Sequence, residues 1–448
     1  MKTNQKLIWG MSAKKWKLRP TPKYDTFGVS RTIPPEDTIE RAIPLMKTLN
    51  VKNMEDIRRV DTDDIPVFVI KRKCDGSRDL YYKGKGYTEN DSLASALMES
   101  VERYSSERFD GRVIYCGYKE IVQKGPAVNP DDLYARVTPS YRKELNVDWV
   151  QGFDLIRQCP TFAPLNLVMW PYVARPEHFS VGSVGLASGN TMEEAISHAL
   201  CEVIEHDANV ISGLFNPWNL SLSVGHEDSS DMTEDSLAER VKEDRTPHLL
   251  FPLIDIKTFP ERAADVAGKL LDAGLLVFAR NTTTDIGVPS VYCAVVKQCP
   301  DGTNLLYDGM GTHPDAEIAL LRALCEAAQS HSAIIWLQER NLWESYYSSS
   351  IAPCERYGYG STCRFSDIAT YKHDTVDADI RFILRRLKAA GLNQVVAFDL
   401  TRTEIGLPVV RVIIPKTEYQ HTEPGEPVLG PRAKKALDFR VQQFIANL

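Results

Sequence analysis

One helical pattern occurs three times in the sequence and constrains the fold more than any other feature. In each copy a glycine turn, at residues 84–86, 185–189 or 309–311, precedes a helix that carries Glu-x-x-Glu or Glu-x-x-Gln. Leu93, Leu97 and Val101 of the first copy recur at helical spacing, which predicts an amphipathic helix. Residues three apart share one helix face. Each copy therefore brings together two oxygen-bearing side chains: Glu99 with Glu102, Glu202 with Glu205, and Glu326 with Gln329.

A second repeat lies between these helices, at residues 60–70, 284–295 and 403–414. Each copy has an acidic residue, a turn with proline, and then a run rich in β-branched residues, which is typical of a core strand entered through a tight turn. At least two of these strands lead on to one of the three helices. The sequence therefore predicts an α/β fold of repeated strand–helix units around one shared cleft.

The repeated carboxylates suggest a metal site. For a single copy a solvated helix face is the simpler interpretation. Three copies, each preceded by a glycine turn, favour a common site. Hard oxygen ligands suit Mg²⁺. A di-iron bundle needs Glu-x-x-His pairs, and none of Glu99, Glu202 or Glu326 has a histidine three residues on. The pattern that remains is a site with several Mg²⁺ ions that holds a polyphosphate.

The stretches 84–103, 189–208 and 322–329 resemble the three ATP-binding signatures of the YcaO family, and the resemblance runs from about residue 27 to residue 418. It implies a YcaO-type α/β fold with one ATP/Mg cleft, ATP and Mg²⁺ as cofactors, and activation of a peptide backbone amide. It implies Mg²⁺ ligation by Glu99, Glu102, Glu202, Glu205 and Glu326. It also implies nucleotide contacts by Arg31, Thr38, Ser95, Arg103, Asn190, Arg322 and Gln329, although Arg103 also suits an in-helix pair with Glu99 or Glu107.

The resemblance further implies phosphoryl transfer to an amide oxygen. The sequence lacks the Pro-x-Pro-x-Pro tail common in azoline-forming members, and we expect no fused leader-peptide-binding module. Both features favour the stand-alone thioamide-forming branch, with a sulfide donor, a possible TfuA-like partner and a target such as a glycine of methyl-coenzyme M reductase. Three alternatives remain: an azoline-forming cyclodehydratase, a non-catalytic ATP-binding subunit, and an iron or manganese enzyme. His206 and His331 stand where the family often has arginine, so the resemblance does not imply phosphate contacts at these positions.

Composition narrows the class of protein. The net charge of −7 argues against non-specific binding to nucleic acid. We expect no signal peptide and no membrane span, because the most apolar run, at 163–174, is short and contains Pro171. Nine cysteines without Cys-x-x-Cys spacing favour reduced thiols and a cytoplasmic location, with Cys201 and Cys325 as packing residues. We also expect a homodimer.

The chain divides into three predicted regions. Residues 1–26 form a basic, solvated arm, residues 27–418 the catalytic domain, and residues 419–448 a tail with a short helix. Within the domain we expect an exposed acidic connection at 216–247, a strand pair within 154–170, helices at 261–273 and 376–391, and a long loop at 346–365.

Overall fold

The computed structural model of the 448-residue chain describes most of the sequence. The described residues are 16–24, 30–59, 64–73, 79–133, 141–172, 175, 178–179, 182–214, 251–300, 304–342, 358, 360–419 and 429–446. The predicted acidic connection at 216–247 and most of the loop predicted at 346–365 lie outside these residues.

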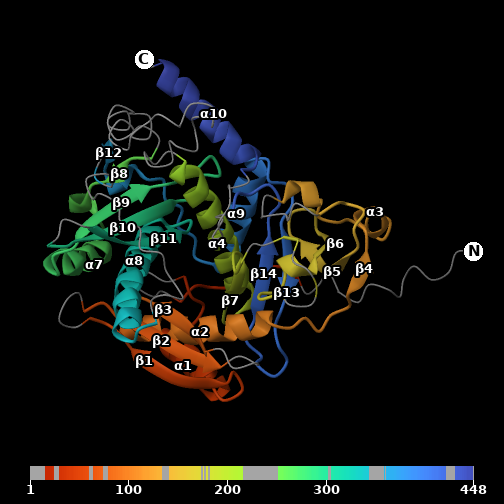
Figure 1. Cartoon of the computed structure of the whole chain (residues 1–448), viewed down its shortest axis with the longest axis horizontal. Coiled ribbons are helices and arrows are strands. Elements are labelled where there is room, and N and C mark those ends of the chain that lie inside the picture. Colours follow the sequence, from red (N-terminus) through yellow and green to blue (C-terminus); the bar gives the residue numbers. More distant parts are fainter. Residues whose placement is uncertain are drawn as a thin grey trace, which may run out of the picture.

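Three β-sheets and the long helices packed on them make up the described part of the molecule (Figure 1). The first sheet has the order β1-β2-β3, with strands Val51–Asp56, Val67–Lys73 and Asp79–Lys85. The second has the order β11-β10-β9-β8-β12; in chain order its strands are Leu253–Ile254 (β8), Leu276–Asn281 (β9), Ser290–Gln298 (β10), Asn304–Thr312 (β11) and Thr362–Cys363 (β12). The third has the order β4-β5-β13-β14-β7, with β6 beside β5; its strands are Ile114–Cys116 (β4), Val147–Asp154 (β5), Cys159–Pro164 (β6), Leu186–Ser188 (β7), Val396–Asp399 (β13) and Val409–Ile413 (β14).

The helices lie between and around the sheets. They are α1 (Pro35–Ala42), α2 (Glu89–Ser106), α3 (Tyr118–Ile121), α4 (Met192–Gly213), α7 (Glu261–Asp272), α8 (Ala316–Glu339), α9 (Val376–Ala389) and α10 (Pro431–Ala446). Short 3-10 helices lie at Ile43–Leu45, Pro130–Asp132, Leu165–Leu167, Ile256–Thr258 and Phe365–Asp367. The helices predicted at 261–273 and 376–391 are confirmed as α7 and α9.

The three repeated helices are α2, α4 and α8, and each begins at a side-chain cap. Thr88 and Asp91 form a capping box at the start of α2. Thr191 accepts a hydrogen bond from the backbone N–H of Glu194 at the start of α4, and Asp315 does the same for Glu317 in α8. Such caps satisfy N–H groups that the first turn leaves without a partner. They fix where each helix begins relative to the strand before it.

Each repeated helix packs on an antiparallel strand pair, which confirms the predicted strand–helix units. In two units the order along the chain is strand, strand, helix: β2-β3-α2 and β10-β11-α8. In the third unit β7 leads into α4, but its partner β14 comes from the other end of the chain and pairs Val410 with Ala187. Apolar clusters fill the space between sheets and helices, and one of them includes both Leu97 of α2 and Val150 of β5. The third strand–helix unit is therefore completed by a strand from the C-terminal part of the sequence.

The glycines before the repeated helices were predicted to form turns, but three of them lie in strands. Gly185 belongs to a turn with φ +80°, but Gly84 lies within β3, and Gly309 and Gly311 lie within β11. A Cβ on Gly309 would overlap the backbone of α8 at Ala323, and the other two strand glycines meet the following helix in the same way. These glycines allow a helix to lie directly against its strand.

Two further expectations need correction. The arm predicted as solvated is packed at 16–24, since Trp16 is 2% exposed and its ring stacks on Phe153. The strand pair expected within 154–170 lies earlier, as β5 and β6, and 165–167 form a 3-10 helix because Pro164 ends the strand. Among the described residues no helix is long and apolar enough to span a membrane.

Candidate active site

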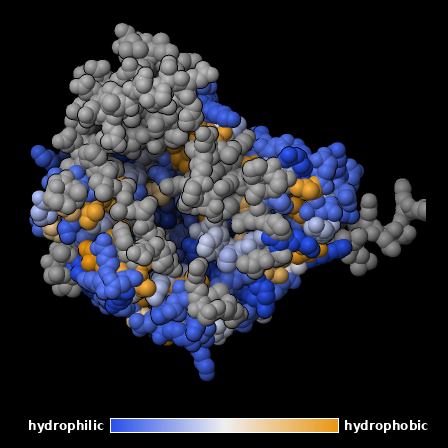
Figure 2. All heavy atoms as spheres, viewed as in Figure 1, coloured by the Kyte–Doolittle hydropathy of each residue, from blue (hydrophilic) through white to orange (hydrophobic). Residues whose placement is uncertain are grey.

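A cavity of about 380 Å³ lies where α2, α4 and α8 meet, and it holds most of the predicted site. The space-filling view, drawn from the same side as Figure 1, has a hydrophilic hollow near the middle of the molecule (Figure 2). The cavity is lined by the five predicted glutamates, Glu99, Glu102, Glu202, Glu205 and Glu326. It is also lined by Arg31, Ser95, Arg103, Arg322 and Gln329. Side chains from three distant parts of the sequence therefore share one site.

Thr38 and Asn190 are the two predicted residues that do not line this cavity. Thr38 is fully buried, and the Asn190 side-chain amide donates to its hydroxyl at 3.0 Å. The same amide donates to Glu194 at 3.1 Å. The structure thus places both residues in a buried network that joins α1 to the start of α4, and their nucleotide contact stays a prediction.

The leading glutamates of α2 and α4 are held in the same way, by backbone N–H groups at a sheet edge. Lys83 N–H donates to Glu99 Oε2 at 3.1 Å, and Gly185 N–H donates to Glu202 Oε2 at 3.1 Å. The donor precedes its acceptor by 16 residues in one unit and 17 in the other. Edge strands leave such N–H groups without a sheet partner. The strand–helix repeat thus fixes one oxygen of each carboxylate.

Burial makes three of the cavity's carboxylates, Glu102, Glu202 and Glu205, unusually weak acids. Desolvation, with repulsion from neighbouring carboxylates, raises the pKa of Glu202 and of Glu205 to about 7. The pKa of Glu102 is also raised, chiefly by burial. Within the described part of the chain, the buried Oε2 of Glu205 has no hydrogen-bond partner. The site therefore favours the entry of a cation.

Mg²⁺ fits this donor set. It prefers oxygen ligands and is usually bound through one or two carboxylates together with substrate phosphates. Among the described residues no three His, Cys, Asp or Glu side chains converge closely enough to hold a metal by themselves. Phosphate oxygens would complete the coordination. Which of the five glutamates are ligands stays a prediction.

Basic side chains balance the carboxylates at the cavity wall. Lys85 forms an ion pair with Glu326, and Lys83 lines the cavity from the same strand. Neither lysine was among the site residues predicted from the sequence. The sequence signal that could have indicated them is their spacing in β3. Residues two apart in a strand point to the same face, so Lys83 and Lys85 lie on one side of the sheet. With them the cavity carries both signs of charge, as a site for Mg²⁺ and a polyphosphate requires.

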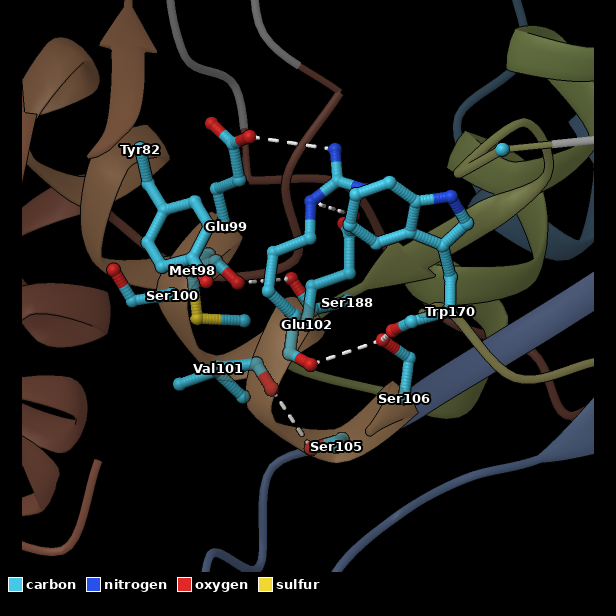
Figure 3. Close-up of polar contacts among 12 residues, drawn as sticks. Tyr82, Met98, Glu99, Ser100, Val101, Glu102, Ser105, Ser106, Trp170 and Ser188 are labelled. Carbon is cyan, nitrogen blue, oxygen red and sulfur yellow. Dashed lines mark hydrogen bonds and ion pairs between the residues drawn. The ribbon is translucent and has the colours of Figure 1, made fainter. Parts of the chain in front are cut away.

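Arg103 lines the cavity and also pairs with glutamates of its own helix. Its guanidinium lies 3.4 Å from Glu99 and 3.7 Å from Glu102, so it is an in-helix partner as well as a lining residue. The Arg103 guanidinium also lies 5.7 Å from the ring centroid of Trp170. The close-up shows the Ser106 hydroxyl next to the backbone of Trp170 (Figure 3). The Ser106 hydroxyl donates to the Trp170 carbonyl at 2.7 Å. Arg103 is therefore held from both sides.

The histidines of the cavity are uncharged at neutral pH. Burial, with the nearby Arg322, lowers the pKa of His198 to about 4. Burial also lowers the pKa of His206, which lines the cavity where arginine was expected. His331 does not line the cavity; it is buried with its ring against Tyr307. Neither His206 nor His331 therefore supplies a positive charge for phosphate.

Comparisons with known proteins show the family to which the chain is related. A family model described as YcaO cyclodehydratase, ATP- and Mg²⁺-binding, matches residues 83–418. An uncharacterized protein of Methanothermobacter thermautotrophicus is 28% identical over 407 residues, covering 88% of this chain and 96% of that protein. An uncharacterized protein in the tfuA 3′ region of Rhizobium leguminosarum bv. trifolii is 27% identical over 416 residues, covering 88% of this chain and 91% of that protein.

Solved structures share the fold. A heterocyclase in complex with substrate and cofactor matches 94% of this chain with a TM-score of 0.74 and 21% identity, and the match spans 57% of that heterocyclase chain. YcaO from Methanopyrus kandleri, bound with AMPPCP and Mg²⁺, matches 91% of this chain and 99% of its own with a TM-score of 0.68 and 22% identity.

Fold and family model together define an α/β protein that binds ATP and Mg²⁺ and that contains a carboxylate-lined cavity. The chain belongs to the YcaO family, whose members modify peptides in reactions that depend on ATP and Mg²⁺.

Proposed function

We propose that this protein uses ATP to phosphorylate a backbone amide oxygen of a peptide and installs a thioamide with sulfide as the nucleophile. The observation that carries the proposal is the convergence of five glutamates and several basic side chains on one cavity. The relative in the tfuA 3′ region supports the thioamide branch and a TfuA-like partner.

The proposed reaction has three steps: addition, phosphoryl transfer and elimination. Sulfide adds to the amide carbon, the resulting oxyanion attacks the γ-phosphorus of ATP, and ADP leaves. Loss of the S–H proton and cleavage of the C–O bond then release phosphate and form C=S. When bound, Mg²⁺ would neutralise the charge on the phosphates. Arg103, Arg322 and Lys85 would stabilise charge that develops on the transferred group, since fixed charges act strongly in a partly buried site.

A second candidate is azoline formation, in which a side chain of the peptide itself attacks the amide. It is favoured by the fold match to a heterocyclase that was solved with its substrate. The two reactions use the same phosphorylation step and differ in the nucleophile. The mass of the product therefore separates them.

The test is mass spectrometry of glycine-containing peptides from methyl-coenzyme M reductase after incubation with the protein, Mg·ATP and sulfide. Exchange of oxygen for sulfur adds about 16 Da, whereas attack by a peptide side chain removes water, about 18 Da. We expect the gain, and we expect Glu99→Gln to abolish it. Glu89→Gln is the matched control, because Glu89 lies on the same helix with its side chain 62% exposed. Equal product from Glu99→Gln and wild type would refute the site.

A further inference from the structure

Residues 16–24 form a strap that lies across the start of α4 and the start of α9. Arg19 N–H donates to Glu193 of α4 at 2.9 Å. The Thr21 carbonyl accepts from Val376 N–H at 2.9 Å, and Thr21 N–H donates to Asp377 at 3.1 Å. The strap thus joins two helices that are distant in the sequence.

The strap ends at a buried ion pair. Lys23 Nζ lies 2.6 Å from Asp379 Oδ2, and the Asp379 side chain is 0% exposed. Asp379 also lies 2.8 Å from His373 Nδ1 and 3.7 Å from His313 Nε2. His313 lines the cavity, and its Nδ1 accepts from Asp315 N–H at 2.9 Å, so Nε2 bears the proton that faces Asp379. One buried carboxylate therefore contacts both the strap and the cavity wall.

The strap is also bonded to Arg31. Tyr24 N–H donates to the Arg31 carbonyl at 2.8 Å, and Thr32 N–H and hydroxyl donate to Glu194 of α4. Arg31 lines the cavity, is 7% exposed, and has no hydrogen-bond partner for Nε among the described residues. Its backbone is thus held while part of its guanidinium stays available to a ligand.

We propose that the Lys23–Asp379 ion pair is a positioning device for the nucleotide site, which fixes the strap and thereby aims Arg31 into the cavity. This inference rests on the proposed function in one respect, that Arg31 contacts the nucleotide phosphates. Removing one partner of a buried pair leaves the other without its counter-charge, so the strap loses the ion pair that holds it next to Tyr24. Arg31 then points into the cavity in only a fraction of the molecules. The apparent affinity for nucleotide falls in proportion to that fraction.

The test measures the dissociation constant of Mg·AMPPCP by calorimetry for Lys23→Met and for Asp379→Asn. Both variants should bind roughly tenfold more weakly than wild type, and no more weakly than Arg31→Met. The two substitutions change the net charge of the region in opposite directions. A purely electrostatic effect would therefore weaken binding in Lys23→Met and strengthen it in Asp379→Asn, which would overturn the proposal.

Two further measurements separate positioning from general damage. In a double-mutant cycle, Lys23→Met combined with Arg31→Met should bind as Arg31→Met does alone, because the ion pair acts through Arg31; additive losses contradict the proposal. Lys17→Met is the matched control, since Lys17 is an exposed residue of the same strap.

Hydrogen exchange of the ligand-free protein gives a measure that does not depend on catalysis. The Tyr24 and Thr32 amides should exchange faster in Lys23→Met than in wild type or Lys17→Met. Unchanged exchange overturns the proposal. If wild type binds Mg·AMPPCP but modifies no peptide, the proposed function fails while these experiments still decide the role of the strap.

Discussion

Glu205 is 7% exposed, and burial raises its pKa from the ordinary 4.5 to about 7. In the unfolded chain the group loses its proton near pH 4.5, so between pH 5 and pH 8 the folded state binds more protons. The free energy of unfolding of the ligand-free protein therefore falls as pH rises through this range, by up to about 3 kcal/mol for this group.

Denaturant unfolding at pH 5 and pH 8 checks this prediction. Glu205→Gln cannot titrate, so its loss of stability between the two values should be smaller than that of wild type by about 1–3 kcal/mol. Glu89→Gln, at an exposed position, should follow wild type. Parallel profiles for wild type and Glu205→Gln would show that the carboxylate is already ionised at pH 5 in the folded protein.

Lys85 permits a prediction about catalysis. It pairs with Glu326 at the cavity wall and has the position and charge to stabilise a transferred phosphoryl group. We expect Lys85→Met to lower ATP turnover by about 100- to 1,000-fold, the range seen when a charge-stabilising donor is removed. ADP release under saturating peptide is the measurement. Lys71→Met, on the neighbouring strand and paired with Asp79, should retain wild-type turnover.

At the level of elements, the contact between β11 and α8 depends on Gly309 and Gly311. Since a Cβ at either position would meet helix backbone, and not the end of a flexible side chain, the strain has no local relief. Gly311→Ala should destabilise the protein by about 1–3 kcal/mol in denaturant unfolding. Gly268→Ala in α7 is the control, because its Cβ would meet nothing within 4 Å and should stabilise by about 0.5–1 kcal/mol. Equal effects would refute the packing role.

Local signals in the sequence predicted the three repeated helices and the strands β2, β10 and β14, because side-chain period and caps act within a few residues. The C-terminal ends of β3 and β11 were instead predicted as glycine turns. Local signals also predicted the shared carboxylate site, since repetition implied a common centre. The pairing of β14 with β7 was not predictable in this way, because Val410 and Ala187 are far apart in the chain. The strap was missed for another reason: its lysines suggested a solvated arm, whereas Trp16 and the Lys23–Asp379 pair hold it against the body.

At the scale of the whole molecule, the cavity is where the three units meet, so a bound ligand contacts all of them at once. Such a ligand binds the folded state alone and stabilises it by an amount that grows with its concentration. At a hundred times the dissociation constant, Mg·AMPPCP should raise the free energy of unfolding by about 2.7 kcal/mol.

The effect should require Mg²⁺. Without it, the nucleotide phosphates would face five glutamates on the cavity wall, and repulsion would oppose binding. Unfolding followed with AMPPCP plus Mg²⁺, and with AMPPCP plus a chelator, should therefore give a large and a small stabilisation respectively. Glu202→Gln should reduce the difference between the stabilisation with Mg²⁺ and the stabilisation with chelator. The variant has one negative charge fewer to repel the phosphates, so less repulsion remains for Mg²⁺ to neutralise. Equal stabilisation of wild type with and without Mg²⁺ would mean that the nucleotide binds away from the glutamates.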